Sequence, residues 1–223
     1  MGRPLRGLGA GIGAALVLVS AELAPARAGE RLIESERQRL ERGELIVKTR
    51  EREGYPWPEV TVYGQIAASA AEVMAVYADF EGQAEYLPGL VESRIVKRLS
   101  PNLFHVSYEY EVTGPNERYT VLAEVSRSPG GFRATWELVS ARYARRLSGQ
   151  VRVEAFGSGA RVEYTNRVDR GFLGARLGSP DTTVRQLRET VQALGARVER
   201  LRVEQPDRLG ELTRALQSML GES

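Results

Sequence analysis

Two residue types that carry much of enzyme and metal chemistry are almost missing from this chain of 223 residues. It has no cysteine, which excludes disulfides, thiolate nucleophiles, cysteine zinc sites and iron–sulfur clusters. It has a single histidine, His105, so histidine-cluster metal sites are excluded and any catalytic triad would need that one side chain. The sequence therefore predicts no metal and no cofactor, and a domain that is held together by its core alone.

Long apolar runs are also scarce, and the clearest one lies near the amino terminus. Leu8–Val19 is apolar or small over about a dozen residues, short of the ~20 that span a bilayer. It follows Arg3 and Arg6 and precedes Ala26-Arg27-Ala28, which is the three-part layout of a secretory signal peptide. An uncleaved membrane anchor is the alternative. We expect residues 1–28 to be removed near Ala28, leaving a periplasmic or secreted protein.

The formal charge of +2 gives little support for a nucleic-acid partner once the charges are located. The chain has 31 basic and 29 acidic residues, and residues 1–28 hold three arginines against one glutamate. Removing that segment leaves 28 residues of each sign, so the mature chain is formally neutral. A basic patch is the usual electrostatic footprint of nucleic-acid binding, and we therefore expect none.

Residues 29–57 form a charged segment ahead of the main pattern. Opposite charges alternate at helical spacing over residues 30–53, which is typical of a solvated helix, and Leu45–Lys48 could form a short strand. A binding arm is the alternative interpretation of the same charges.

From residue 58 the pattern becomes that of a regular α+β domain. Val60–Ile66 alternates as a strand, Ser69 and Glu72 form a capping box for a short helix, and a second short helix precedes Pro88. About six runs with a period of two follow, and then a long amphipathic helix over residues 182–203. Because a curved sheet with one apolar face needs a cover, we expect the long helix to pack on it. Pro206 separates a further helical segment, residues 205–223.

Two segments carry a resemblance to a known family. Ile66–Phe80 and the stretch Tyr86–Ser93, which contains Tyr86-Leu87-Pro88-Gly89, resemble the opening of the START-like helix-grip (SRPBCC) superfamily. They are most similar to its polyketide cyclase/dehydrase and coenzyme-Q-binding branch, and the resemblance covers roughly residues 58–202. It implies a helix-grip fold at 58–204, with a curved antiparallel sheet of about seven strands wrapped around the long helix. It also implies a hydrophobic cavity for lipids, quinones or polyketides, while a minority of members are cyclases, aromatases or hydrolases.

Strand alternation selects the candidate ligand-binding residues. Six side chains fall on the expected concave face and combine apolar walls with a few hydrogen-bonding tips, as ligand pockets do. They are Tyr108, Tyr110, Tyr119, Trp136, Tyr164 and Asn166. The alternative is that they only fill the core.

Two further residues are weighed by the same alternation. Arg145 shares the parity of Leu147, so it could be an inward anion anchor, but a bulge that places it outside is the preferred interpretation because unpaired arginine is rarely buried. His105 alternates with Phe104 and Val106 and should face outward, which argues against a catalytic role. We expect no catalytic constellation.

These observations leave three functional hypotheses. The leading one is an exported, monomeric binding or carrier protein that holds a hydrophobic small molecule or lipid between sheet and helix. The second is a cyclase or dehydratase that uses a tyrosine or Arg145 in the same cavity. The third is a membrane-surface or protein-interaction module built on residues 30–53 and the carboxy-terminal helices, with transient membrane contact. A large apolar cavity would favour the carrier, and a small one with paired polar groups would favour catalysis.

Overall fold

The computed structural model describes residues 32–112, 115–169, 171 and 179–221. The predicted signal peptide, residues 1–28, lies outside them. The helices are α1 (Glu34–Glu41), α2 (Ala70–Ala78), the 3₁₀ helix η1 (Phe80–Glu85), α4 (Pro180–Glu204) and α5 (Pro206–Met219). The strands are β1 (Ile46–Arg50), β2 (Glu59–Ile66), β3 (Leu90–Ser100), β4 (Leu103–Tyr110), β5 (Glu117–Ser128), β6 (Gly131–Ala141), β7 (Arg146–Phe156) and β8 (Gly159–Asp169).

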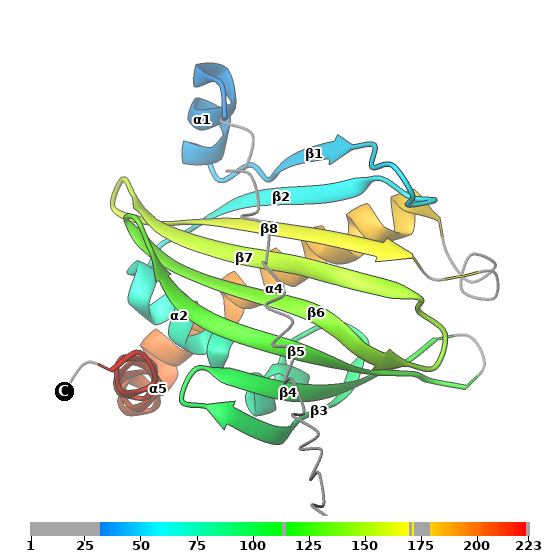
Figure 1. Cartoon of the computed structure of the whole chain (residues 1–223). Coiled ribbons are helices and arrows are strands. Elements are labelled where there is room, and N and C mark those ends of the chain that lie inside the picture. Colours follow the sequence, from blue (N-terminus) through cyan, green and yellow to red (C-terminus); the bar gives the residue numbers. More distant parts are fainter. Residues whose placement is uncertain (1–31, 113–114, 170, 172–178, 222–223) are drawn as a thin grey trace, which may run out of the picture. The chain divides into compact units, whose positions relative to one another are not determined.

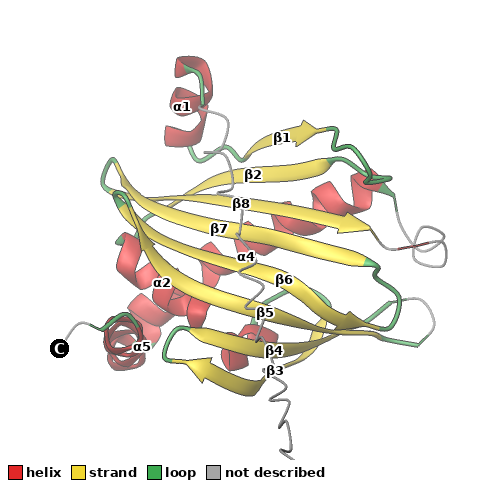
Figure 2. Cartoon of the chain, in the orientation of Figure 1, coloured by secondary structure: helices red, strands yellow, loops and turns green. Residues whose placement is uncertain are grey.

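The strands form one antiparallel sheet in the order β1-β2-β8-β7-β6-β5-β4-β3 (Figure 2). Strands β3 to β8 follow one another as a meander, and β2 closes the order by pairing with β8, with Val62 opposite Tyr164. The helix-grip fold is therefore confirmed, with eight strands where about seven were expected. The additional strand is β1, which pairs with β2 and places Ile46 opposite Tyr63.

Strand β1 and helix α1 belong to the same compact unit as the rest of the fold, residues 33–223. The predicted charged helix is shorter than its charge pattern, because only Glu34–Glu41 is helical. Lys48 of β1 forms a 3.0 Å ion pair with Glu36 of α1, and Leu40 is fully buried. Residues 34–50 are thus attached to the sheet edge.

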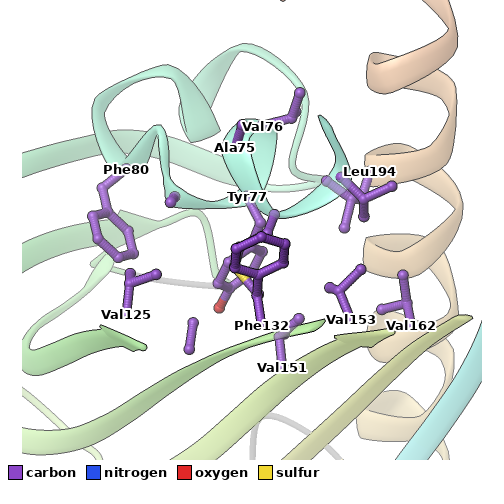
Figure 3. Packing of buried hydrophobic residues seen from close by; sticks show 14 of the residues in the cluster. Ala75, Val76, Tyr77, Phe80, Val125, Phe132, Val151, Val153, Val162 and Leu194 are labelled. Atoms are coloured by element: carbon purple, nitrogen blue, oxygen red, sulfur yellow. The ribbon is translucent and has the colours of Figure 1, made fainter. Parts of the chain in front are cut away.

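Helix α2 begins at the predicted capping box and packs on the inner face of the sheet. The backbone N–H of Glu72 donates to Ser69 Oγ at 3.2 Å, and the Glu72 carboxylate accepts from the Ser69 N–H at 2.8 Å. Residues 73–78 are all buried. Figure 3 shows Tyr77 of α2 in the core between that helix and the sheet, which contributes Val151 and Val153, with Leu194 of α4 at one side of the same core.

The long helix α4 crosses the same face of the sheet (Figure 1). Its Leu187 and Val191 pack against Val60 and Val62 of β2. Gly64 permits this approach, because a Cβ at that position would lie 2.6 Å from Val191 Cγ1. A glycine inside a strand often marks such a close contact.

Helix α5 turns back at Pro206 and packs against α2. Leu209, Leu212 and Leu216 are buried in the same core cluster as the sheet and α2. The carboxy-terminal helix therefore contributes to the core of the domain. None of the described helices is both long enough and apolar enough to cross a membrane.

Candidate functional site

Two adjoining cavities lie between the inner face of the sheet and the helices. The outer one has a volume of about 170 Å³ and reaches the ends of β4, β5 and β8 and the first turns of α4. The inner one, about 40 Å³, lies deeper, toward Tyr77 of α2 and Phe80 of η1. The outer cavity is lined by Pro88, Tyr110, Glu111, Val112, Glu117, Tyr119, Trp136, Tyr143, Ala144, Leu147, Tyr164, Asn166, Val168, Thr183, Gln186, Leu187 and Thr190.

The six concave-face candidates all come together here. Tyr110, Tyr119, Trp136, Tyr164 and Asn166 line the outer cavity, and Tyr108 lines the inner one. Four of the six, Tyr110, Tyr119, Trp136 and Tyr164, line both. The strand alternation thus placed these side chains on the correct face, while their contact with a ligand stays a prediction.

Arg145 does not join them. It is exposed and lines neither of the two cavities. It precedes the first residue of β7, and its backbone N–H donates to the Asp169 carbonyl at 2.7 Å. Arg145 therefore lies outside, as in the preferred interpretation, and the alternative of an inward anion anchor is wrong, because its parity argument extended a strand alternation beyond the end of the strand.

His105 lies on the outer face of β4. The burial pattern of the strand alternates, with Phe104 and Val106 fully buried and His105 partly exposed between them. Its cross-strand neighbours are Lys97 and Leu122. The only imidazole of the chain is therefore directed away from both cavities.

The aromatic side chains of the cavity lining form two groups of contacting rings. The rings of Tyr110 and Tyr119 stack at 5.9 Å with an interplanar angle of 7°. The Trp136 and Tyr164 rings lie 5.3 Å apart, and Tyr77 contacts Tyr164 edge-on at 6.3 Å. Flat faces of this kind offer a large apolar area, while the hydroxyl and indole groups supply a few polar tips.

Burial keeps the tyrosine hydroxyls protonated. It raises the pKa of Tyr110 to about 12, and it raises the pKa of Tyr164 further. It also raises the pKa of Tyr108 and of Tyr119 well above the ordinary value, again with desolvation as the largest cause. At neutral pH these groups can donate or accept hydrogen bonds, but they cannot act as bases.

Among the described lining residues, the charged groups are two carboxylates at the rim. Glu111 is exposed. One oxygen of Glu117 accepts from the backbone N–H groups of Arg142 and Tyr143, both at 3.2 Å. No lysine, arginine or histidine of the described ranges lines either cavity. Within the part of the chain that the structure describes, no cluster of three His, Asp or Glu side chains could hold a metal ion.

Two positions that shape the outer cavity were missed by the sequence interpretation. Gly149 faces inward between Trp136 and Asn166, its partners on the two flanking strands, and a Cβ there would lie 2.3 Å from Trp136 Cζ2. A glycine inside a strand was the available signal. Thr183 lies one helical turn before Leu187, so the helix period already placed it on the buried face.

Thr183 and Asn166 each have a buried side-chain oxygen without a hydrogen-bond partner. Thr183 Oγ1 and Asn166 Oδ1 are both buried without a hydrogen-bond partner, and both residues line the outer cavity. Buried polar atoms are normally paired, because an unpaired one retains its desolvation cost.

Comparison with known proteins is consistent with this architecture. The sequence model of the family described as "Polyketide cyclase / dehydrase and lipid transport" matches residues 58–200. A STAR-related lipid transfer protein from Xanthomonas axonopodis superposes with a TM-score of 0.60 at 19% identity, over 70% of this chain and 93% of that one. Human StAR-related lipid transfer protein 5 gives a TM-score of 0.58 at 12% identity, over 72% and 84%.

A START superfamily protein from Mycobacterium smegmatis gives a TM-score of 0.53 at 16% identity, over 64% of this chain and 98% of that one. At such identities the structural likeness concerns the fold. No match was found among curated proteins.

Proposed function

Because the chain belongs to the polyketide cyclase/dehydrase and lipid transport family, we propose that it is an exported binding or carrier protein for a hydrophobic molecule. The ligand, a small molecule or lipid, occupies the cavity between the sheet and α4. The observation that carries the proposal is the aromatic wall of Tyr110, Tyr119, Trp136 and Tyr164, which surrounds open space instead of being packed shut. Concave, largely apolar sites with few polar tips are typical of small-molecule binding.

The enzyme hypothesis retains part of its basis. Tyr108 and Tyr164 face the cavities, and the outer cavity is small, but a catalytic site was expected to combine a small volume with paired polar groups. The buried oxygens of Asn166 and Thr183 are unpaired, so only the first half of that expectation is met. A general base within hydrogen-bond reach is needed for cyclase or dehydratase chemistry. The buried tyrosines stay protonated, and the two carboxylates are at the rim, so the binding function is the better supported one.

The interaction-module hypothesis loses support from the packing of its segments. The leucines of α5 are buried in the core, and α1 is attached to β1 through the Glu36–Lys48 ion pair. Neither helix presents a free apolar face for a membrane or a partner.

Native mass spectrometry of the protein purified from its own host tests the binding function. We expect a bound species that organic extraction removes. Thr190→Phe on α4 should fill the outer cavity and abolish the adduct, since Thr190 lines it and is not part of the buried core. Arg188→Phe, on the exposed side of the same helix, is the matched control and should retain it. Absence of any adduct, or equal adducts in both variants, would contradict the proposal.

A further inference from the structure

The size of the cavity limits what it can hold. Its outer part measures about 170 Å³ and its inner part about 40 Å³. Pockets for drug-sized ligands begin near roughly 300 Å³, whereas an engineered apolar cavity of about 150 Å³ accommodates benzene. A lipid with two acyl chains does not fit a space of this size. A molecule of one or two rings fits, if the end of the molecule that lies away from the inner cavity extends toward the opening of the outer cavity.

The walls favour rings and disfavour anions. The parallel pair Tyr110–Tyr119 and the indole of Trp136 present flat faces that stack on another ring with offset or edge-on geometry. Among the residues that the structure describes, the only charged side chains of the lining are Glu111 and Glu117, so a carboxylate or phosphate would meet negative charge there. An uncharged ligand avoids that cost.

The two unpaired oxygens specify a polar group on the ligand. Asn166 Oδ1 accepts a hydrogen bond, and the Thr183 hydroxyl can donate or accept one. They come from opposite walls of the same cavity, Asn166 from β8 and Thr183 from the first turn of α4. A ligand hydroxyl has the complementary capacity, since it can donate to the amide oxygen of Asn166 and accept from the hydroxyl of Thr183.

We propose that the ligand is a compact, uncharged ring compound whose hydroxyl group hydrogen-bonds with Asn166 and Thr183. This inference rests on the proposed binding function and narrows its ligand class. It predicts discrimination against the same ring without a hydroxyl, because the two buried oxygens would then stay unpaired.

Titration calorimetry of the purified full chain with four probes tests the assignment. The probes are 2-naphthol, naphthalene, 2-naphthoate and decan-1-ol. We expect 2-naphthol to bind about tenfold more tightly than naphthalene, the factor that corresponds to one or two neutral hydrogen bonds. The anion and the linear alcohol should bind more weakly than 2-naphthol. Thr190→Phe should abolish binding, which locates the probes in the outer cavity.

Two near-isosteric variants separate the hydroxyl contact from apolar binding. Asn166→Leu and Thr183→Val should each reduce the preference for 2-naphthol over naphthalene while leaving naphthalene binding unchanged or slightly stronger. Thr213→Val on α5 is the control, because its hydroxyl already donates to the Leu209 carbonyl at 2.9 Å and it lines neither cavity. If Asn166→Leu fails to fold, the affinities of the four probes for the wild type and for Thr183→Val still test the predicted hydrogen bond of the ligand hydroxyl.

The outcomes distinguish this inference from the function on which it rests. Equal affinity for 2-naphthol and naphthalene, or a preference that both variants retain, would overturn the hydroxyl assignment and leave hydrophobic binding intact. Tighter binding of decan-1-ol or 2-naphthoate would overturn the ring or the charge assignment in the same way. Failure of every probe would overturn the inference, and only if the host-purified protein also lacks an adduct does the binding function fail with it.

Discussion

At the scale of single residues, the open space beside Trp136 depends on one missing side chain. A Cβ at Gly149 would lie 2.3 Å from Trp136 Cζ2 and 2.4 Å from the Thr165 carbonyl oxygen. Contacts this short require the indole or the backbone to move. Gly149 therefore positions the cavity wall without contributing a side chain to it.

Gly149→Ala should destabilise the fold by about 1–3 kcal/mol, the usual cost of overpacking a tight site. It should also weaken 2-naphthol binding, because the displaced indole enters the outer cavity. Urea unfolding and calorimetry measure the two effects. Gly210→Ala on α5 is the matched control and should instead stabilise by up to about 1 kcal/mol, since alanine favours the helix and only the mobile end of Arg214 is near. Equal effects of the two substitutions would exclude the positioning role.

Asp79, which follows α2, gives a prediction about pH. Burial is the largest cause that raises its pKa above the ordinary 3.8, and Arg208, 3.5 Å away, acts in the opposite direction. The folded state therefore binds this proton at a higher pH than the unfolded chain. The associated stability is present below 3.8 and is lost as pH rises through the folded pKa.

Asp79→Asn removes that dependence and keeps the oxygen that accepts from the Gly82 N–H. The free energy of unfolding of Asp79→Asn minus that of the wild type should increase between about pH 4 and pH 7. Urea titrations over this range measure the difference. A difference that is flat, or that falls with pH, would show that the ion pair with Arg208 outweighs burial.

At the scale of elements, alternation predicted most of the sheet because strands such as β4, β5 and β7 bury alternate side chains, whereas β3 is exposed along most of its length. The same reasoning did not predict that β1 belongs to this sheet. Five residues at an edge show too little alternation to reveal a pairing partner, and the register with β2 depends on contacts distant in sequence. The amphipathic period of α5 was visible, but its docking on α2 was not, since a pattern does not name the surface that covers it. The cavity volume was equally hidden, because it follows from packing such as that of Gly149 against Trp136.

Helix α5 should behave as a part of the core. Leu216 is 1% exposed within the main hydrophobic cluster, so Leu216→Ala should cost about 2–5 kcal/mol of unfolding free energy. Val203→Ala, at a residue that is 77% exposed near the end of α4, is the comparison and should change stability by less than about 0.5 kcal/mol. Chemical denaturation followed by circular dichroism measures both. A loss at Leu216 as small as that at Val203 would mean that α5 is only an appendage.

At the scale of the whole molecule, we expect export and folding to depend on different segments of the chain. The compact unit comprises residues 33–223, so cleavage after Ala28 would remove nothing from it. The cleaved chain would also be formally neutral, because residues 1–28 carry the entire excess of basic charge. We therefore predict that removal of the segment leaves stability and ligand binding unchanged.

Expression of the full chain in a secreting host, followed by intact-mass measurement of the exported protein, tests the processing. The expected mass is that of residues 29–223. Signal peptidases require small residues at the cleavage pattern, so Ala28→Leu should leave the chain uncleaved and membrane-associated, whereas Ala24→Leu, outside the Ala26-Arg27-Ala28 pattern, should be processed normally. Exported protein that retains residues 1–28 in the wild type would identify the segment as an anchor. Retention of the full chain inside the cell would contradict export itself, while the cavity and its predicted preference for a hydroxylated ring would be unaffected.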